Sequence, residues 1–220
     1  MKLLQLNRLS AKYAQGVVDA FDRLPHTRHK DGEYRLRRYS VVELRTTFWS
    51  AVTQIEISQL PARSFEQSKE LNSHQGGMSR LFEPIEDDVL QSNCVKEACL
   101  AFYRANDLYG GQEVEIHQMR VVALPSQNAD RRWTPVAPEG VHQDGFDYIA
   151  MLGVNRHNIE GGELMVYKDE DSDPFMTHAL GSGEIIMLDD RKLWHNAKPI
   201  SRENPSREGY GDWFVLCVKE

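Results

Sequence analysis

Two histidines and one aspartate have the residue types and the spacing of a metal site. His142 and Asp144 are two residues apart, and His195 follows after enough chain for several strands. Residues two apart on an extended segment project to the same face, because side chains alternate along a strand. Two imidazoles and one carboxylate form the ligand set of non-haem iron(II) sites that keep coordination positions open. These three residues are therefore the predicted metal ligands and catalytic residues.

A His-x-Asp motif is a weak signal by itself, since the chain contains 8 histidines. Its position strengthens the prediction: His142 lies between a loop and an apolar stretch, and His195 follows the apolar run 183–188. Zinc is the main competitor, because a two-histidine and carboxylate set also serves hydrolases. However, the sequence has no helical His-Glu-x-x-His pattern, and no neighbouring glutamate stands out as a general base. Iron is the preferred metal.

Composition indicates an ordinary globular protein. The chain has 220 residues, 40% of them hydrophobic and 27% charged, so we expect a single domain over 1–220. A net charge of −7 without a basic run argues against nucleic-acid and membrane partners. Three cysteines are a poor disulfide framework, and no apolar run approaches the roughly 18 residues of a membrane span. The predicted location is cytoplasmic.

Apolar periodicity divides the chain into two parts. Helices are predicted over 10–24 and 84–106, and strands over 34–44, 113–124, 148–154, 163–167, 183–188 and 212–218. The predicted organisation is a helical N-terminal part, about 1–110, packed against a β core, about 111–220. The fold class is therefore mainly β with flanking helices (α+β), and its core resembles a sandwich or barrel.

Several short motifs carry a family resemblance. The supporting stretches are Arg37-Arg38-Tyr39-Ser40, His117-Gln118-Met119-Arg120, Pro138-Glu139-Gly140-Val141-His142-Gln143-Asp144-Gly145, Asn158-Ile159-Glu160-Gly161-Gly162, Asp189-Asp190-Arg191 and His195-Asn196-Ala197-Lys198-Pro199-Ile200. In order and spacing, the chain resembles iron(II)/2-oxoglutarate-dependent dioxygenases over about 20–218. More narrowly, it resembles the bacterial free-amino-acid hydroxylase branch that includes the L-isoleucine 4-hydroxylases.

The resemblance implies a double-stranded β-helix (jelly-roll) core and an enzyme that uses Fe(II), 2-oxoglutarate and O2, with ascorbate as an optional stimulant. The implied reaction is hydroxylation of an aliphatic carbon in a free L-amino acid or a similar small carboxylate substrate. Related halogenases have a small residue in place of the carboxylate ligand, so Asp144 favours hydroxylation over halogenation. A homo-oligomer remains open, as do the amino acid, the carbon and the stereochemistry.

One position departs from the family pattern. An arginine that binds the distal carboxylate of 2-oxoglutarate usually begins the last core strand, and Gly211 stands at the corresponding place. Arg207, four residues earlier, and Arg120, on an earlier strand, are the two candidate cofactor-binding replacements. Arg202 and Lys198 are weaker candidates. The competing interpretations are a solvated surface loop for Arg207 and an internal ion pair for Arg120.

Other interpretations remain beside the leading one. Arg35 and Arg37 alternate on a predicted strand and are interpreted as a solvated or ion-paired face, and His117 as a structural residue. The missing arginine at 211 leaves open a cupin-like oxygenase or isomerase that does not use 2-oxoglutarate. A non-catalytic metal-binding protein is the third alternative.

Overall fold

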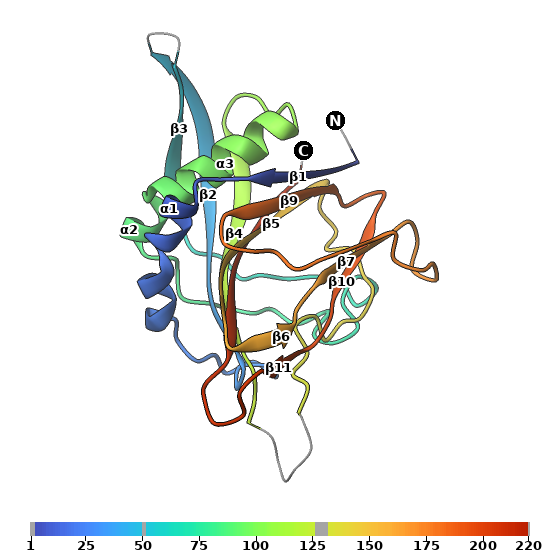
Figure 1. The fold of residues 1–220 in the computed structure, drawn as a ribbon. Coiled ribbons are helices and arrows are strands. Elements are labelled where there is room, and N and C mark those ends of the chain that lie inside the picture. Colours follow the sequence, from blue (N-terminus) through green and yellow to red (C-terminus); the bar gives the residue numbers. More distant parts are fainter. Residues whose placement is uncertain (1–2, 50–51, 126–131, 220) are drawn as a thin grey trace.

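A curled antiparallel sheet dominates the structure (Figure 1). The computed structural model describes residues 3–49, 52–125 and 132–219. The sheet has the strand order β1-β9-β5-β12-β4-β2-β3. Its strands are β1 (Leu4–Arg8), β2 (Arg35–Trp49), β3 (Val52–Gln59), β4 (Gln112–Val122), β5 (Tyr148–His157), β9 (Glu184–Asp189) and β12 (Tyr210–Val218).

Smaller sheets cover one face of this large sheet. β10 (Trp194–Ala197), β7 (Leu164–Tyr167) and β8 (Met176–His178) form one, and β11 (Ile200–Arg202) pairs with β6 (Ile159–Gly161) in another. Apolar side chains from both layers form one buried cluster, in which Val121, Ile149 and Trp213 of the large sheet meet Val166 and Ile200. This two-layer, mainly β arrangement confirms the predicted jelly-roll-like fold.

Helices cover the opposite, outer face of the large sheet (Figure 1). They are α1 (Ala11–Gln15), the 3-10 helix η1 (Val18–Arg23), α2 (Asp87–Leu90) and α3 (Asn93–Ala105). α3 buries residues at helical spacing, among them Val95, Cys99 and Phe102, against this face. None of the helices within the described ranges is long and apolar enough to cross a membrane.

The N-terminal half contains more strand than the sequence predicted. The helical part expected over about 1–110 includes β1, β2 and β3 as well as helices. The helix predicted over 10–24 divides after Gly16 into α1 and η1, and the one over 84–106 divides at Ser92. The Ser92 hydroxyl accepts a hydrogen bond from the Val95 amide at 3.3 Å and caps a new helix there. Local capping therefore interrupts a continuous apolar periodicity.

Alternation along β4 and β12 decides which side chains reach the interior between the layers. Met119 and Val121 of β4 point into the cluster between the layers, whereas Ile116 points to the helices. On β12, Cys217 points inward and Phe214 packs on the helical side. Because side chains alternate with a period of 2, this register also fixes where the polar residues of these strands point.

Candidate active site

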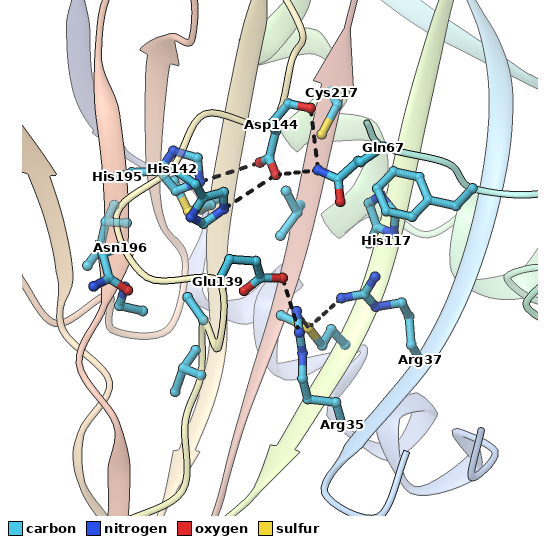
Figure 2. A pocket seen from close by; sticks show the side chains of 18 of the residues that line it. Arg35, Arg37, Gln67, His117, Glu139, His142, Asp144, His195, Asn196 and Cys217 are labelled. Carbon is cyan, nitrogen blue, oxygen red and sulfur yellow. Dashed lines mark hydrogen bonds and ion pairs between the residues drawn. The ribbon is translucent and has the colours of Figure 1, made fainter. Parts of the chain in front are cut away.

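The three predicted ligands come together between the two layers (Figure 2). His195 lies on β10 and His142 in the loop before β5. The two backbones form a reciprocal pair, with the His142 amide 3.0 Å from the His195 carbonyl and the His195 amide 2.9 Å from the His142 carbonyl. One donor atom from each of His142, Asp144 and His195 lies within 4.8 Å of the others. This pairing places both imidazoles on one side of the loop.

Both imidazoles direct Nε2 to the same carboxylate. Nε2 of His142 lies 3.6 Å from Oδ1 of Asp144, and Nε2 of His195 lies 3.4 Å from Oδ2. Nδ1 of His142 is 2.9 Å from the Gly140 carbonyl, which fits a protonated Nδ1 and a free Nε2 lone pair. Burial disfavours the Asp144 carboxylate, but the two histidines outweigh it and hold its pKa well below the usual value. The donor set fits a divalent metal ion.

A second buried aspartate shapes the ligand loop. The Asp190 carboxylate accepts hydrogen bonds from the backbone amides of Asp144 at 3.1 Å, Gly145 at 2.8 Å and Phe146 at 3.1 Å. One of its oxygens also lies 3.7 Å from Nδ1 of His195. Asp190 therefore holds the segment that carries Asp144 in place.

Replacing Asp190 by alanine should weaken metal binding without removing a ligand. Three buried amides lose their acceptor, so the Asp144 segment loses its fixed position. We expect metal affinity to fall by about 10- to 100-fold, as for other residues that orient metal ligands. Titration of Mn(II) into the wild type and the variant measures this loss. Asp190→Asn, which keeps one acceptor oxygen, should lie between them, and unchanged affinity in both variants would contradict the role.

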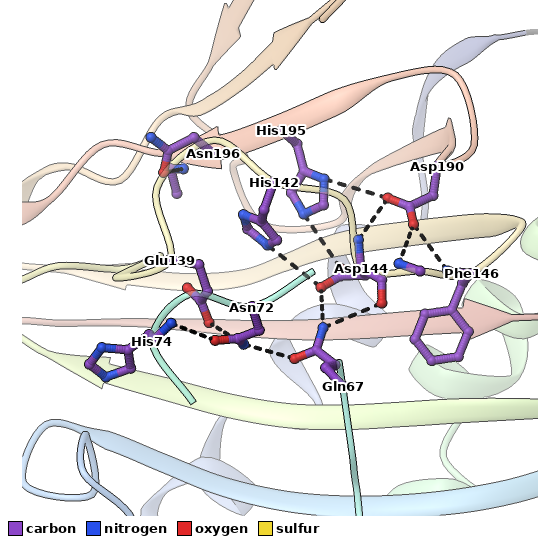
Figure 3. Close-up of polar contacts among 12 residues, drawn as sticks. Gln67, Asn72, His74, Glu139, His142, Asp144, Phe146, Asp190, His195 and Asn196 are labelled. Atoms are coloured by element: carbon purple, nitrogen blue, oxygen red, sulfur yellow. Dashed lines mark hydrogen bonds and ion pairs between the residues drawn. The ribbon is translucent and has the colours of Figure 1, made fainter. Parts of the chain in front are cut away.

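The loop between β3 and α2 reaches the metal carboxylate (Figure 3). Nε2 of Gln67 donates to Oδ1 of Asp144 at 3.1 Å. Oε1 of Gln67 in turn accepts from Nδ2 of Asn72 at 2.9 Å and from Nη2 of Arg80 at 3.0 Å. This network orients Asp144 from the side opposite Asp190.

A cavity opens beside the three ligands, and its polar wall includes three arginines. Arg35, Arg37 and Arg80 all line it. Arg35 and Arg37 were interpreted as a solvated or ion-paired face; they are only 6% and 8% exposed, so the face is not solvated, whereas Arg35 is ion-paired. The loop that carries Gln67 and Arg80 folds over the inner face of β2 and removes both side chains from solvent. His117, interpreted as structural, also lines this cavity, between the rings of Tyr39 and Phe65.

The arginines differ in their partners. Nη1 of Arg35 forms ion pairs with Asp31 at 2.8 Å and with Glu139 at 3.5 Å. Nη2 of Arg37 donates a hydrogen bond to the sulfur of Met119 at 3.4 Å. Among the described residues, no carboxylate forms an ion pair with Arg37. Burial, with the positive charge of Arg35, lowers the pKa of Arg37 to about 9. Arg37 is thus a buried cation in need of an anion.

Neither predicted cofactor-binding residue lines the cavity. Arg120 points to the helical side of β4, where Nε donates to Asp212 at 2.6 Å and Nη1 to Asp22 at 2.7 Å. This is the internal ion pair that the sequence left as the alternative. Arg207 is exposed in the turn before β12. Of the weaker candidates, Arg202 donates to the Ala123 carbonyl at 2.8 Å, and Lys198 is exposed.

Arg120→Met should destabilise the fold. The change leaves the fully buried Asp212 carboxylate without its cation, and breaking a buried pair costs about 3–5 kcal/mol. Urea unfolding measures the free energy of unfolding. The double variant Arg120→Met/Asp212→Asn should recover part of the loss, because it removes the unpaired charge. A single variant as stable as the wild type would show that this pair contributes little.

Sequence reasoning passed over two features of the cavity wall. Glu139 lines the cavity, and its Oε2 is buried without a hydrogen-bond partner in the described part of the chain. Arg37 was interpreted as part of a solvated or ion-paired face, and its place in the cavity wall was not predicted. The available signal was an unusual density of arginines on a predicted strand that the family motif also covers, but strand alternation alone does not say which face a later loop will bury.

Comparison with known proteins agrees with this geometry. The family described as 2OG-Fe dioxygenase matches residues 18–217. Among solved structures, a BsmA homolog from Methylobium petroleophilum PM1 has a TM-score of 0.73 at 22% identity, covering 95% of this chain and 81% of that one. IDO from Bacillus thuringiensis has a TM-score of 0.67 at 19% identity, covering 96% and 86%. No curated protein sequence matches the chain.

The chain belongs to the 2OG-Fe dioxygenase family. The two solved structures are similar in fold. Family membership implies Fe(II), 2-oxoglutarate and O2, and a His-Asp-His site with a metal-compatible donor set is present. It also favours a 2-oxoglutarate-dependent enzyme over the cupin-like and non-catalytic alternatives.

Proposed function

We propose that this protein hydroxylates an aliphatic carbon of a free amino acid, or of a similar small carboxylate substrate, with His142, Asp144 and His195 as the iron ligands. When bound, iron(II) with 2-oxoglutarate and O2 supplies the oxidising chemistry, in which 2-oxoglutarate becomes succinate and CO2 while the substrate gains a hydroxyl group. The chain's own residues bind and orient the substrate and keep water from the reacting carbon.

The observation that carries this proposal is a buried cation without a paired carboxylate, and a glutamate oxygen without a hydrogen-bond donor, in one cavity with the three ligands. Arg37 is a buried cation without a paired carboxylate in the described residues, and Oε2 of Glu139 is a buried acceptor without a donor. An α-amino acid carries a carboxylate and an ammonium group that would satisfy both. Buried polar groups without partners are costly, so a substrate that pairs with both gains affinity and orientation.

The rest of the lining fits an aliphatic side chain. Phe146, Met151, Leu164 and Val215 contribute apolar surface to the same cavity. Such surface binds an aliphatic group and excludes water, while the charged wall fixes the other end of the molecule. A substrate held at its polar end presents a carbon of its side chain to the metal. The resemblance to the free-amino-acid hydroxylase branch supports the same substrate class.

The experiment is incubation of the protein with Fe(II), 2-oxoglutarate, ascorbate and a pool of L-amino acids, followed by mass spectrometry. We expect succinate, and a gain of one oxygen atom in one amino acid or a small group of them. Each responding amino acid is then compared with its 2-hydroxy analogue, which lacks the ammonium group and should stimulate less. Succinate formation that no amino acid stimulates would overturn the substrate class, and absence of succinate would overturn the reaction.

A further inference from the structure

β12 begins without a basic residue, and a side chain at position 211 would not fit. Gly211 is the residue at the place where the family pattern has an arginine. A Cβ atom at this position would collide with the indole ring of Trp213, which lies over the glycine. The Trp213 ring is part of the apolar cluster between the two layers. The space that an arginine side chain on β12 would use is therefore filled.

An arginine faces Gly211 from the neighbouring strand. Arg156 of β5 is the direct register partner of Gly211. Residues directly opposite each other in an antiparallel pair project to the same face. Asp212, the next residue, points to the outer face with Arg120, so Gly211 and Arg156 belong to the inner face. The β5–β12 ladder thus carries an arginine on one strand where the other carries a glycine.

The guanidinium of Arg156 is held at one end and unsatisfied at the other. Nη2 donates to the Gly161 carbonyl, which fixes the side chain. Nη1 is buried and has no hydrogen-bond partner among the described residues. Burial lowers the pKa of Arg156, against the opposing effect of Glu163 and Glu203, yet neither glutamate forms an ion pair with it in the described ranges. A buried donor of this kind calls for an acceptor.

Nη1 of Arg156 packs against the backbone of Gly162, and neither residue is part of the cavity lining. A Cβ at Gly162 would lie only 3.2 Å from Nη1, so a residue without a side chain lets the guanidinium pack this close to the chain. Leu164, two residues further along the chain, lines the cavity. Two residues of extended chain span about 7 Å. A short stretch of chain therefore connects the residue against which Nη1 packs to a residue of the cavity wall.

We infer that Arg156, on β5, binds the distal carboxylate of 2-oxoglutarate in place of an arginine on β12. The inference rests on the proposed function, since it concerns the co-substrate of the same site. The buried Nη1 without a partner among the described residues fits a carboxylate, which would supply the acceptor that it lacks. The register of the ladder explains the exchange: Arg156 is the inner-face position directly opposite Gly211, so the cation comes from β5 where Trp213 leaves no room for one at Gly211.

The test is calorimetric binding to the Mn(II)-loaded protein, which needs no turnover. Two ligands are compared, 2-oxoglutarate and 2-oxopentanoate, which has the same chain length without the distal carboxylate. The proteins are the wild type, Arg156→Met, Arg156→Lys, and the matched variants Arg207→Met and Arg37→Met. Thermal unfolding and Mn(II) affinity are measured for each, so that a folding defect is recognised.

We expect Arg156→Met to weaken 2-oxoglutarate binding by at least about 30-fold, as for loss of one partner of a buried charge pair, and to leave 2-oxopentanoate binding nearly unchanged. Arg156→Lys keeps a cation and should lose less affinity for 2-oxoglutarate. This variant also tests the inference if Arg156→Met does not fold. Equal losses for both ligands, or a selective loss in Arg207→Met instead, would overturn the inference alone. A selective loss in Arg37→Met instead would overturn it and would also remove Arg37 from substrate binding. Failure of the wild type to bind 2-oxoglutarate would overturn the proposed function together with it.

Discussion

Replacement of Asp144 by alanine is expected to abolish 2-oxoglutarate turnover and to lower metal affinity by more than about 100-fold. Replacing a residue that only orients a metal ligand lowers metal affinity by about 10- to 100-fold, so the loss of a ligand itself should lower it further. Asp144 is also the one carboxylate on which both histidine Nε2 atoms converge, at 3.6 and 3.4 Å. Its removal leaves two neutral donors and an incomplete set.

Metal affinity, turnover and thermal unfolding together separate loss of the metal from loss of the fold. Mn(II) titration gives the affinity, and succinate formation with saturating Fe(II) gives the turnover. Asp171→Ala, in the exposed loop after β7, is the matched control and should behave as the wild type. Thermal unfolding of metal-free Asp144→Ala should remain cooperative. Turnover in Asp144→Ala at the wild-type rate would remove Asp144, and with it the triad, from the proposed metal site.

Arg37→Met should raise the KM for the responding amino acid by about 30-fold or more. Truncating one partner of a buried, charge-assisted pair costs about 2 kcal/mol at the least, and 1.4 kcal/mol is tenfold in affinity. The substrate carboxylate would lose its cation, while the metal ligands keep their geometry. When the substrate is poorly held, turnover of 2-oxoglutarate is less tightly coupled to hydroxylation. More succinate should therefore form for each hydroxylated product than in the wild type.

The variant on the same strand that serves as a control is Arg45→Met. Arg45 is exposed and pairs with Glu43 at 2.9 Å, away from the cavity. Its loss should leave the KM for the amino acid and the KM for 2-oxoglutarate unchanged. The KM for 2-oxoglutarate in Arg37→Met separates the two carboxylate sites. If this value rises while that for the amino acid does not, Arg37 serves the co-substrate, and substrate recognition has to be sought elsewhere in the cavity.

The sequence alone predicted the fold class and the candidate metal triad from local patterns. Alternation on an extended segment linked His142 to Asp144, and the structure brings these two together in the loop before β5 instead. An apolar run followed by His195 indicated the strand that brings the second histidine back. The apolar periodicity of 113–124 gave the correct faces of β4, so that His117 and Arg120 lie on opposite sides of the sheet.

Helix boundaries and the N-terminal strands were harder to predict. The apolar positions of 84–106 are consistent with one helix, and only the Ser92 cap shows that there are two. β1 was missed because it is only five residues long and mostly exposed. Such a strand forms because an edge of the sheet, β9, offers its backbone groups for pairing. Pairing of this kind is a long-range property.

The charged residues of the cavity were decided by tertiary structure alone. Whether Arg37 faces solvent depends on a loop that folds back from residues 60–82, and whether Arg120 is free depends on Asp212, far away in the sequence. The same holds for Arg156, which gains meaning only from its partner Gly211 across the β5–β12 ladder. Sequence fixes which face of a strand a side chain takes, because alternation is local. What covers that face, and which charges meet there, is set by contacts between segments distant in the chain.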